Sequence, residues 1–168
     1  MPFETLNDVF VDQIEDLYSA ETQLVAALPK VASAVSDATL REAIEHHLEQ
    51  TRGHVQRLQQ IKDDRGITGS ERCKGMAGLL AEGEETIGES GHGPAKDAAI
   101  IADAQRIEHH EIAAYGTVKT LAKELGYDDA AKLLDETLSE EGAADDLLTK
   151  IATGGLLHSG LNAEAASN

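Results

Sequence analysis

The sequence has little cysteine and no long apolar run. Cys73 is the only cysteine among 168 residues, so an intramolecular disulfide is excluded and no cysteine-based zinc site is expected. No stretch approaches the roughly 18 consecutive apolar residues of a transmembrane helix, so we expect no membrane partner. The first residues lack the basic and apolar regions of a secretory signal, which makes the cytoplasm the expected location.

Positive charge is also scarce. Lysine and arginine number 14 against 31 aspartates and glutamates, and the formal net charge is −17 at pH 7. A general nucleic-acid-binding surface needs a basic patch, so no nucleic-acid partner is expected. The same charge disfavours anionic membranes and favours the attraction of cations.

Aromatic residues make up only 3% of the chain, whereas apolar residues make up 41%. Most of that apolar content is alanine, leucine, isoleucine and valine. Alanine, leucine, glutamate, lysine and glutamine favour helices, so the composition predicts an all-α fold of one domain.

Apolar residues recur at helical spacing in four long segments. The predicted helices cover about 5–35, 38–64, 94–125 and 128–152. Residues 65–95 form a long crossover that contains an additional short helix near 73–89. We therefore predict a bundle over 1–155 and a flexible C-terminal tail over 156–168.

A shift of 90 residues superimposes the two predicted helix pairs, so that Leu17 meets Ile107 and Glu21 meets Glu111. Two helical hairpins joined by a long crossover form a ferritin-like four-helix bundle. The length of the crossover lets the second and third long helices run parallel.

Carboxylates interrupt the apolar stripe of the third long helix, where Glu108 and Glu111 lie one turn apart. Buried carboxylates are costly unless they are paired or bound to a cation. Counting from the two hairpin loops brings Glu21, Glu111, residues 50–54 and residues 140–145 to one depth. The spacing therefore predicts a polar or metal-binding core, with oxygen donors and a minority of nitrogen donors that suit iron or manganese.

Four segments, 16–24, 47–58, 97–116 and 136–141, carry a resemblance that extends over nearly the whole chain. They resemble the YciE/YciF-type ferritin-like stress proteins, relatives of rubrerythrin and ferritin. This resemblance implies a four-helix bundle with an extra crossover helix, homodimers, a cytoplasmic location and a di-iron centre.

The resemblance also implies a ligand set, although the match to the family pattern is incomplete. The expected ligands are four carboxylates, one imidazole and one weaker or indirect ligand: Glu21, Glu108, Glu111, Glu141, His54 and Gln50. Ferritin-like sites carry Glu-x-x-His on two helices. Here the second helix has Thr51 three residues before His54, and the fourth helix has no histidine after Glu141.

Some ligand assignments stay open at this point. Glu140 and Asp145 are alternatives to Glu141, and His47 lies on the inner side of its helix as a less favoured ligand. The first functional hypothesis is a metal-binding stress protein, with iron or alternatively manganese, that oxidises iron or reduces oxygen or peroxide. The alternative is a non-enzymatic dimeric stress protein with a metal-free carboxylate core. The sequence leaves open whether the protein is an enzyme.

Overall fold

The computed structural model describes residues 3–155 and 158–167. Five helices make up most of the fold: α1 (Leu6–Ala34), α2 (Ala38–Arg65), α3 (Lys74–Gly88), α4 (Pro94–Glu124) and α5 (Asp128–Thr153). Two short strands, β1 (Gly154–Gly155) and β2 (His158–Ser159), and the helix α6 (Leu161–Ala166) follow. The predicted all-α class and the four long helices are confirmed, with boundaries that differ by at most one residue.

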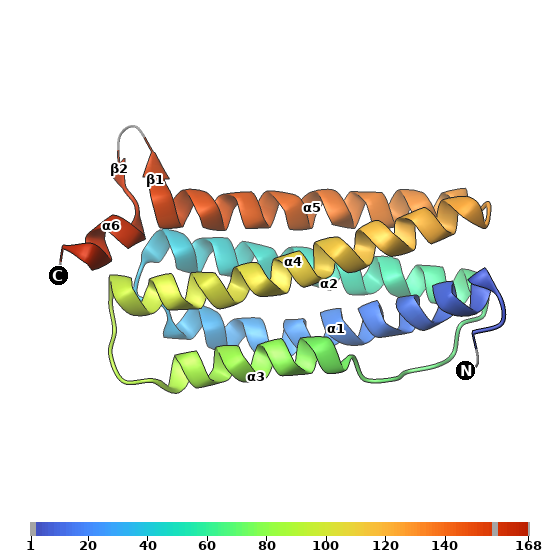
Figure 1. The fold of residues 1–168 in the computed structure, drawn as a ribbon, viewed down its shortest axis with the longest axis horizontal. Coiled ribbons are helices and arrows are strands. Elements are labelled where there is room, and N and C mark those ends of the chain that lie inside the picture. Colours follow the sequence, from blue (N-terminus) through green and yellow to red (C-terminus); the bar gives the residue numbers. More distant parts are fainter. Residues whose placement is uncertain (1–2, 156–157, 168) are drawn as a thin grey trace.

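Helices α1 and α2 form one antiparallel hairpin, and α4 and α5 form the other (Figure 1). Helix α1 packs against α4, and α2 packs against α5, which closes a four-helix bundle. The crossover runs back along the bundle, with α3 packed on the outside of α1 and α4. As a result α2 and α4 run parallel, as the length of the crossover predicts.

Local chemistry sets the ends of the long helices. The Thr5 hydroxyl accepts a hydrogen bond from the Asp8 amide at 3.2 Å, and the Asp8 carboxylate accepts one from the Thr5 amide at 2.8 Å. This reciprocal pair is a capping box that begins α1. Gly66 ends α2 with a φ of 66°, a left-handed conformation that glycine adopts without steric cost.

One buried carboxylate joins the two hairpins. Asp97, in the first turn of α4, accepts hydrogen bonds from the Ser36 and Asp37 amides at 2.9 Å and 2.8 Å. Asp37 in turn caps α2 by accepting from the Leu40 amide. Since the loop between α1 and α2 is held to the start of α4, the register of the two hairpins is fixed along the bundle.

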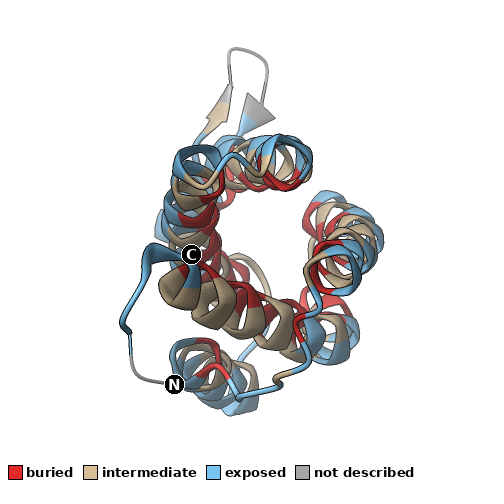
Figure 2. Cartoon of the chain, turned by 90° about the vertical axis from the view of Figure 1, so that its right-hand side faces the viewer, coloured by how far each residue is buried: buried red, intermediate tan, exposed pale blue. Residues whose placement is uncertain are grey.

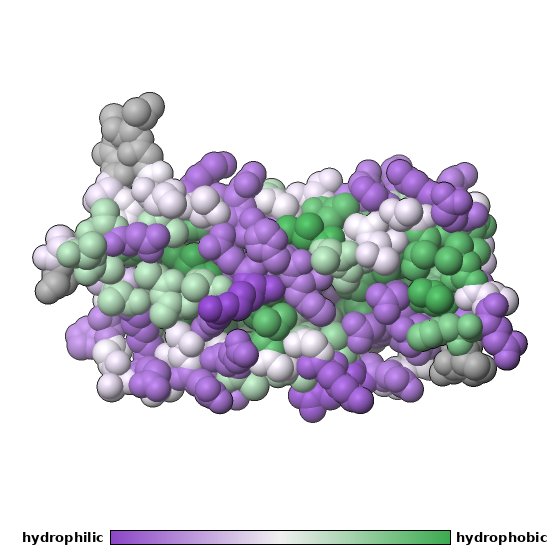
Figure 3. Space-filling view, viewed as in Figure 1, coloured by the Kyte–Doolittle hydropathy of each residue, from purple (hydrophilic) through white to green (hydrophobic). Residues whose placement is uncertain are grey.

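Buried residues lie on the inward faces of the long helices (Figure 2). They form two apolar clusters, one on each side of a central layer of charged and polar groups. Hydrophilic residues and extended apolar patches alternate over the face shown in Figure 3. In the described part of the chain, no helix is long and apolar enough to cross a membrane.

The C-terminal segment differs from the flexible tail predicted over 156–168. Its described residues form β2, which pairs antiparallel with β1, and then α6. Leu161 anchors α6, because its side chain is buried in the apolar core. Gly160 lets the start of α6 lie against the end of α5, since a Cβ at position 160 would lie 2.2 Å from the backbone nitrogen of Gly154. Residues 156, 157 and 168 of the predicted tail lie outside the described residues.

Candidate metal centre

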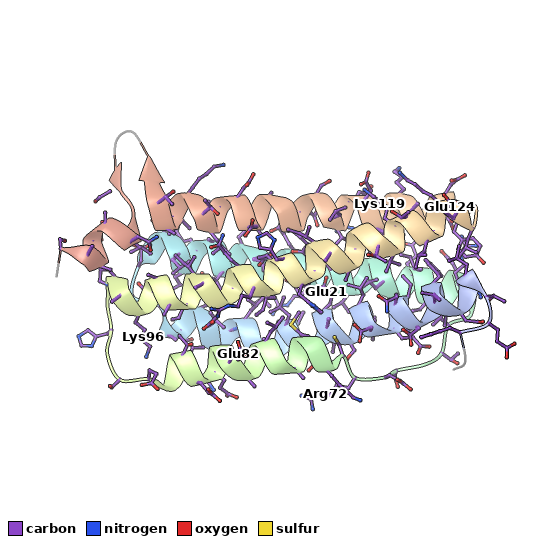
Figure 4. The ribbon with its side chains drawn as sticks, in the orientation of Figure 1. Glu21, Arg72, Glu82, Lys96, Lys119 and Glu124 are labelled. Carbon is purple, nitrogen blue, oxygen red and sulfur yellow. The ribbon has the colours of Figure 1, made fainter. Side chains whose placement is uncertain are left out.

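Six ionisable side chains form a buried layer at mid-length of the bundle. Helix α1 supplies one glutamate, α2 two histidines, α4 two glutamates and α5 one glutamate: Glu21, His47, His54, Glu108, Glu111 and Glu141. All six are at most 8% exposed by side chain or residue. Figure 4 labels Glu21 between the helices and, for contrast, Glu124 at the outer end of α4.

These side chains form two overlapping groups. One consists of His47, Glu108, Glu111 and Glu141, and the other of Glu21, His54 and Glu141. Within each group, one potential ligand atom from every residue lies within 4.8 Å of the others. Glu141 belongs to both groups, so its carboxylate stands where it can bridge two cations.

Many polar atoms of this layer have no hydrogen-bond partner. Both carboxylate oxygens of Glu111 are buried with no hydrogen-bond partner. The oxygens of Glu141 and the ring nitrogens of His47 are also buried outside any regular hydrogen bond, although Glu141 lies within ion-pair distance of both histidines. Buried polar groups in native proteins are nearly always hydrogen-bonded, because an unpaired one costs roughly 1–3 kcal/mol. A set of orphaned oxygen and nitrogen atoms that converge from four helices is the arrangement expected of ligands.

Burial shifts the protonation of the carboxylates. It raises the pKa of Glu108 to about 10, and the nearby Glu141 carboxylate adds to the rise. Burial and the Glu21 carboxylate hold the pKa of Glu111 well above its usual range. Glu108 and Glu111 therefore hold protons at neutral pH, which reduces the negative charge of the layer.

His54 lies between carboxylates on both sides of its ring. Its Nδ1 is 2.9 Å from Glu141 Oε1 and 3.3 Å from Glu21 Oε1, and its Nε2 is 2.8 Å from Glu140 Oε2. Burial alone would lower the pKa of His54, but the Glu141 and Glu21 carboxylates outweigh it and raise the pKa to about 10.

Glu140 supports His54 from outside the layer. Arg57 binds both Glu140 oxygens, with distances of 2.6 Å from Nη1 to Oε2 and 3.0 Å from Nη2 to Oε1. The arginine lowers the pKa of Glu140 and keeps it ionised. A carboxylate that accepts from one ring nitrogen fixes the tautomer and orients the other nitrogen towards a metal. Glu140 thus orients the His54 ring from outside the layer, and His54 Nδ1 faces Glu21 and Glu141 inside it.

His47 is the buried imidazole at the other group. Its Nε2 lies 3.4 Å from Glu108 Oε1 and 3.8 Å from Glu141 Oε2. Burial lowers the pKa of His47, which leaves the neutral form that metals bind. Tyr115 completes the layer, because its hydroxyl donates a 2.5 Å hydrogen bond to Glu21 Oε1 and orients that carboxylate.

The structure brings five of the six predicted ligands together: Glu21, His54, Glu108, Glu111 and Glu141. The sixth, Gln50, is half-buried beside the layer, where its side chain interacts with His47. Among the alternatives to Glu141, Glu140 pairs with Arg57 and Asp145 accepts from Gln105.

The histidines of the layer differ in number from the expected ligand set. The sequence predicts His54 as the imidazole ligand and His47 as a less favoured one. The structure puts both imidazoles on α2, where His47 and His54 are two turns apart on one face. Their spacing of seven residues is the sequence signal that indicates that both rings face the layer.

The donor set fits the group implied by the family resemblance. Ferritin-like centres use four glutamates and two histidines, and this layer has the same inventory. Only the distribution differs, because both histidines come from α2 and two glutamates from α4. Oxygen-rich sites with some imidazole and no thiolate suit iron or manganese.

A four-helix bundle with a long crossover and a mid-length layer of glutamates and histidines is a ferritin-like helical protein. Residues 5–165 match the family model described as Domain of unknown function (DUF892), and the chain belongs to that family.

Relatives with known names support the same assignment. Protein YciF of Escherichia coli strain K12 is 46% identical over 154 residues, which cover 90% of this chain and 93% of that protein. The crystal structure of the E. coli stress protein YciF matches with a TM-score of 0.84, covering 88% of this chain and 94% of that chain. YcfI of Rhodopseudomonas palustris is 38% identical with a TM-score of 0.85, covering 89% of this chain and 96% of that chain.

Proposed function

We propose that this YciF-type stress protein binds two cations in its buried layer and uses them to oxidise iron or to reduce oxygen or peroxide. Iron is the expected metal, and manganese is the alternative. The observation that carries the proposal is the Glu141 carboxylate, which is fully buried and belongs to both ligand groups.

Each proposed ligand has a defined place. His47, Glu108 and Glu111 would hold one cation, Glu21 and His54 the other, and Glu141 would contact both. Gln50 would act indirectly, through its interaction with His47. Two divalent cations would offset the four carboxylate charges and remove the cost of burying them.

The remaining groups position the ligands. Arg57 holds Glu140, which directs the His54 ring, and Tyr115 holds Glu21. The six side chains of the layer are buried, and the low polarity around them strengthens the electrostatic interactions between them. When bound, iron would supply the exchange of electrons with oxygen or peroxide, while the protein binds and orients it.

The first test measures metal content in protein purified without chelator. Wild type is expected to retain close to stoichiometric iron or manganese, and Glu111→Gln to lose most of it. Glu124→Gln is the matched control, since it makes the same change at an exposed position of α4. Absence of metal from wild type after anaerobic iron loading would refute the proposal.

A second test separates binding from chemistry. Iron-loaded wild type is expected to consume oxygen or peroxide faster than free iron at the same concentration. Glu140→Gln keeps every proposed ligand but removes the charge beside His54, so metal affinity should fall by roughly 10- to 100-fold. Inert iron-loaded protein would leave a binding function and remove the enzymatic one.

The alternative function is a non-enzymatic stress protein that acts as a homodimer with a metal-free core. One observation favours it, because a charged His54 between Glu21 and Glu141, with protonated Glu108, forms a core with little net charge without metal. The homodimer and the cytoplasmic location are part of both proposals. Sedimentation of metal-free and loaded protein tests the dimer, and a metal-free dimer of normal stability would support the alternative.

A further inference from the structure

A second group of ligand-type side chains lies outside the buried layer. Asp16 of α1, Cys73 at the start of α3 and His110 of α4 each place one ligand atom within 4.8 Å of the other two. The three residues line a cavity of about 320 Å³ near the beginning of the crossover helix. Asp16 and His110 are half-buried and Cys73 is buried, so the cavity side of the group is accessible.

The spacing of these atoms is close to that of a zinc site. Cys73 Sγ and His110 Nε2 are 3.9 Å apart. A tetrahedral zinc with Zn–S near 2.3 Å and Zn–N near 2.1 Å separates these two atoms by about 3.6 Å. A shift of a few tenths of an ångström would therefore suffice for the thiol and imidazole, and a rotation would bring in the carboxylate.

The backbone around Cys73 is fixed before any ligand arrives. The Cys73 amide donates to Ser19 Oγ at 2.9 Å, and the Cys73 carbonyl accepts from Gln23 Nε2 at 3.1 Å. Both partners belong to α1, the helix that carries Asp16. Because the thiol and the carboxylate are thus anchored to one rigid helix, their separation is held by the fold.

The missing side chain of Gly75 leaves room for the His110 ring beside Cys73. A Cβ at position 75 would lie 2.9 Å from His110 Cε1, closer than side chains approach one another. A larger residue there would displace the ring from Cys73. The crossover helix therefore begins with two features that suit this group, a cysteine and, two residues later, a residue without a side chain.

A purely structural role explains only part of this arrangement. Cys73 Sγ accepts a hydrogen bond from the Met76 amide at 3.4 Å and caps α3. This contact accounts for the buried sulfur but not for the carboxylate and imidazole that face it from two other helices. Burial and the Asp16 carboxylate raise the pKa of the Cys73 thiol, which a cation between the two groups would reverse.

We propose that Asp16, Cys73 and His110 form a separate cation site for Zn²⁺ or a metal of similar ligand preference. Three protein ligands would leave one position open towards the cavity, and binding would release the thiol proton to solvent. Thiolate and imidazole select a softer metal than the oxygen-rich layer around Glu111. The absence of a second cysteine excludes sites built on several thiolates but not a mixed site of this kind.

The test uses Co²⁺ as a spectroscopic probe and Zn²⁺ in competition with a chromogenic chelator. Wild type is expected to bind Co²⁺ with a near-ultraviolet band from thiolate-to-metal charge transfer. Cys73→Ser should lose the band yet stay folded, since serine is a good helix cap. Glu111→Gln should keep the band, which separates this site from the buried layer and from the proposed function.

Two matched controls address the other ligands. Asp16→Asn should weaken Zn²⁺ binding by roughly tenfold or more, whereas Asp12→Asn, which alters the same cavity one turn away, should not. His110→Gln should weaken binding in the same way, and the exposed neighbour His109→Gln should not. Gly75→Ala should reduce affinity without changing a ligand atom.

Either of two results would overturn this site. One is the absence of a charge-transfer band in folded wild type at excess Co²⁺. The other is a band of unchanged affinity in the double variant Asp16→Asn, His110→Gln, which would mean that the thiol binds the probe alone.

Discussion

The two halves of the bundle interior, on either side of the buried ionisable layer, are filled differently. One half, the packed half, contains Phe10, Tyr115, Tyr127 and large aliphatic side chains. The other, the hollow half, is built from alanine and aliphatic residues such as Ala20, Leu24, Ile44 and Leu148. A cavity of about 630 Å³ opens within the hollow half and reaches His47 and Glu108.

The difference follows from where the few aromatic residues lie. In the packed half Phe10 and Tyr127 meet edge to face, with ring centroids 5.4 Å apart, and the Tyr115 ring reaches the layer. Small side chains such as Ala27, Ala104 and Ala144 line the cavity of the hollow half. The same four long helices therefore enclose an aromatic-rich core at one end and an open space at the other, and the layer can be approached from the open side.

The largest effect on stability is expected from truncating leucines of α1, and it should differ between the two halves. Leu17 lies in the packed half and Leu24 lines the cavity, and both are 2% exposed. Leu17→Ala should lower the free energy of unfolding by about 4 kcal/mol, because it removes contacts and creates a new void. Leu24→Ala should cost only about 2–3 kcal/mol, because it enlarges an existing space. Urea unfolding of both variants checks this, and equal losses would contradict the difference between the halves.

The next effect is the dependence of stability on pH in metal-free protein, which the layer between the two halves causes. The pKa of Glu108 is raised from 4.5 to about 10, and that of His54 from 6.5 to about 10. Between these limits the folded chain binds more protons than the unfolded chain, so stability falls as pH rises. Each of the two groups contributes about 1.4 kcal/mol per pH unit, so we expect a loss of roughly 2–3 kcal/mol per pH unit above neutrality.

Unfolding in the presence of chelator, over a series of pH values, measures this loss. Glu108→Gln should reduce the dependence of stability on pH by about half, because glutamine has no proton to lose while His54 still titrates. The stability of metal-loaded protein should instead rise with pH, since the ligands bind metal in their deprotonated forms. Stability of the metal-free protein that rises with pH above neutrality would contradict the pKa shifts.

The smallest effect compares two alanines of α4 that are 18 residues, or five helical turns, apart. Ala122 is fully buried in the packed half, and Ala104 lines the cavity. Ala122→Leu should destabilise by about 1–3 kcal/mol through overpacking. Ala104→Leu should change stability by less than about 1 kcal/mol, because the added carbons enter free space. Thermal unfolding distinguishes the two, and an equal cost would mean that the cavity closes in solution.

Much of the fold could be predicted because its signals are local. Apolar spacing and caps such as Asp37 mark the helices, and the length of the crossover predicts the parallel arrangement of α2 and α4. The depth count brought Glu21, His54 and Glu111 to one level without any contact information. Helix α6 could not be predicted in this way, because the packing of Leu161 depends on a surface made by other helices.

Details of the candidate site depended on helix rotation. Adjacent residues of a helix point about 100° apart, so Glu140 and Glu141 face different surroundings although both lie at the right depth. The structure turns Glu141 inwards and pairs Glu140 with Arg57. The same rotation brings His47 into the layer and leaves Gln50 at its edge.

The sequence by itself determined the helices, the acidic charge and the level at which carboxylates interrupt the apolar stripe, because each depends on short-range spacing. Only the tertiary structure decided which side chains meet. The convergence of Asp16, Cys73 and His110 from three elements, the sharing of Glu141 between two ligand groups and the hollow half all depend on how the helices are rotated and packed. Those contacts join residues far apart in the chain, and no local pattern encodes the distance between them.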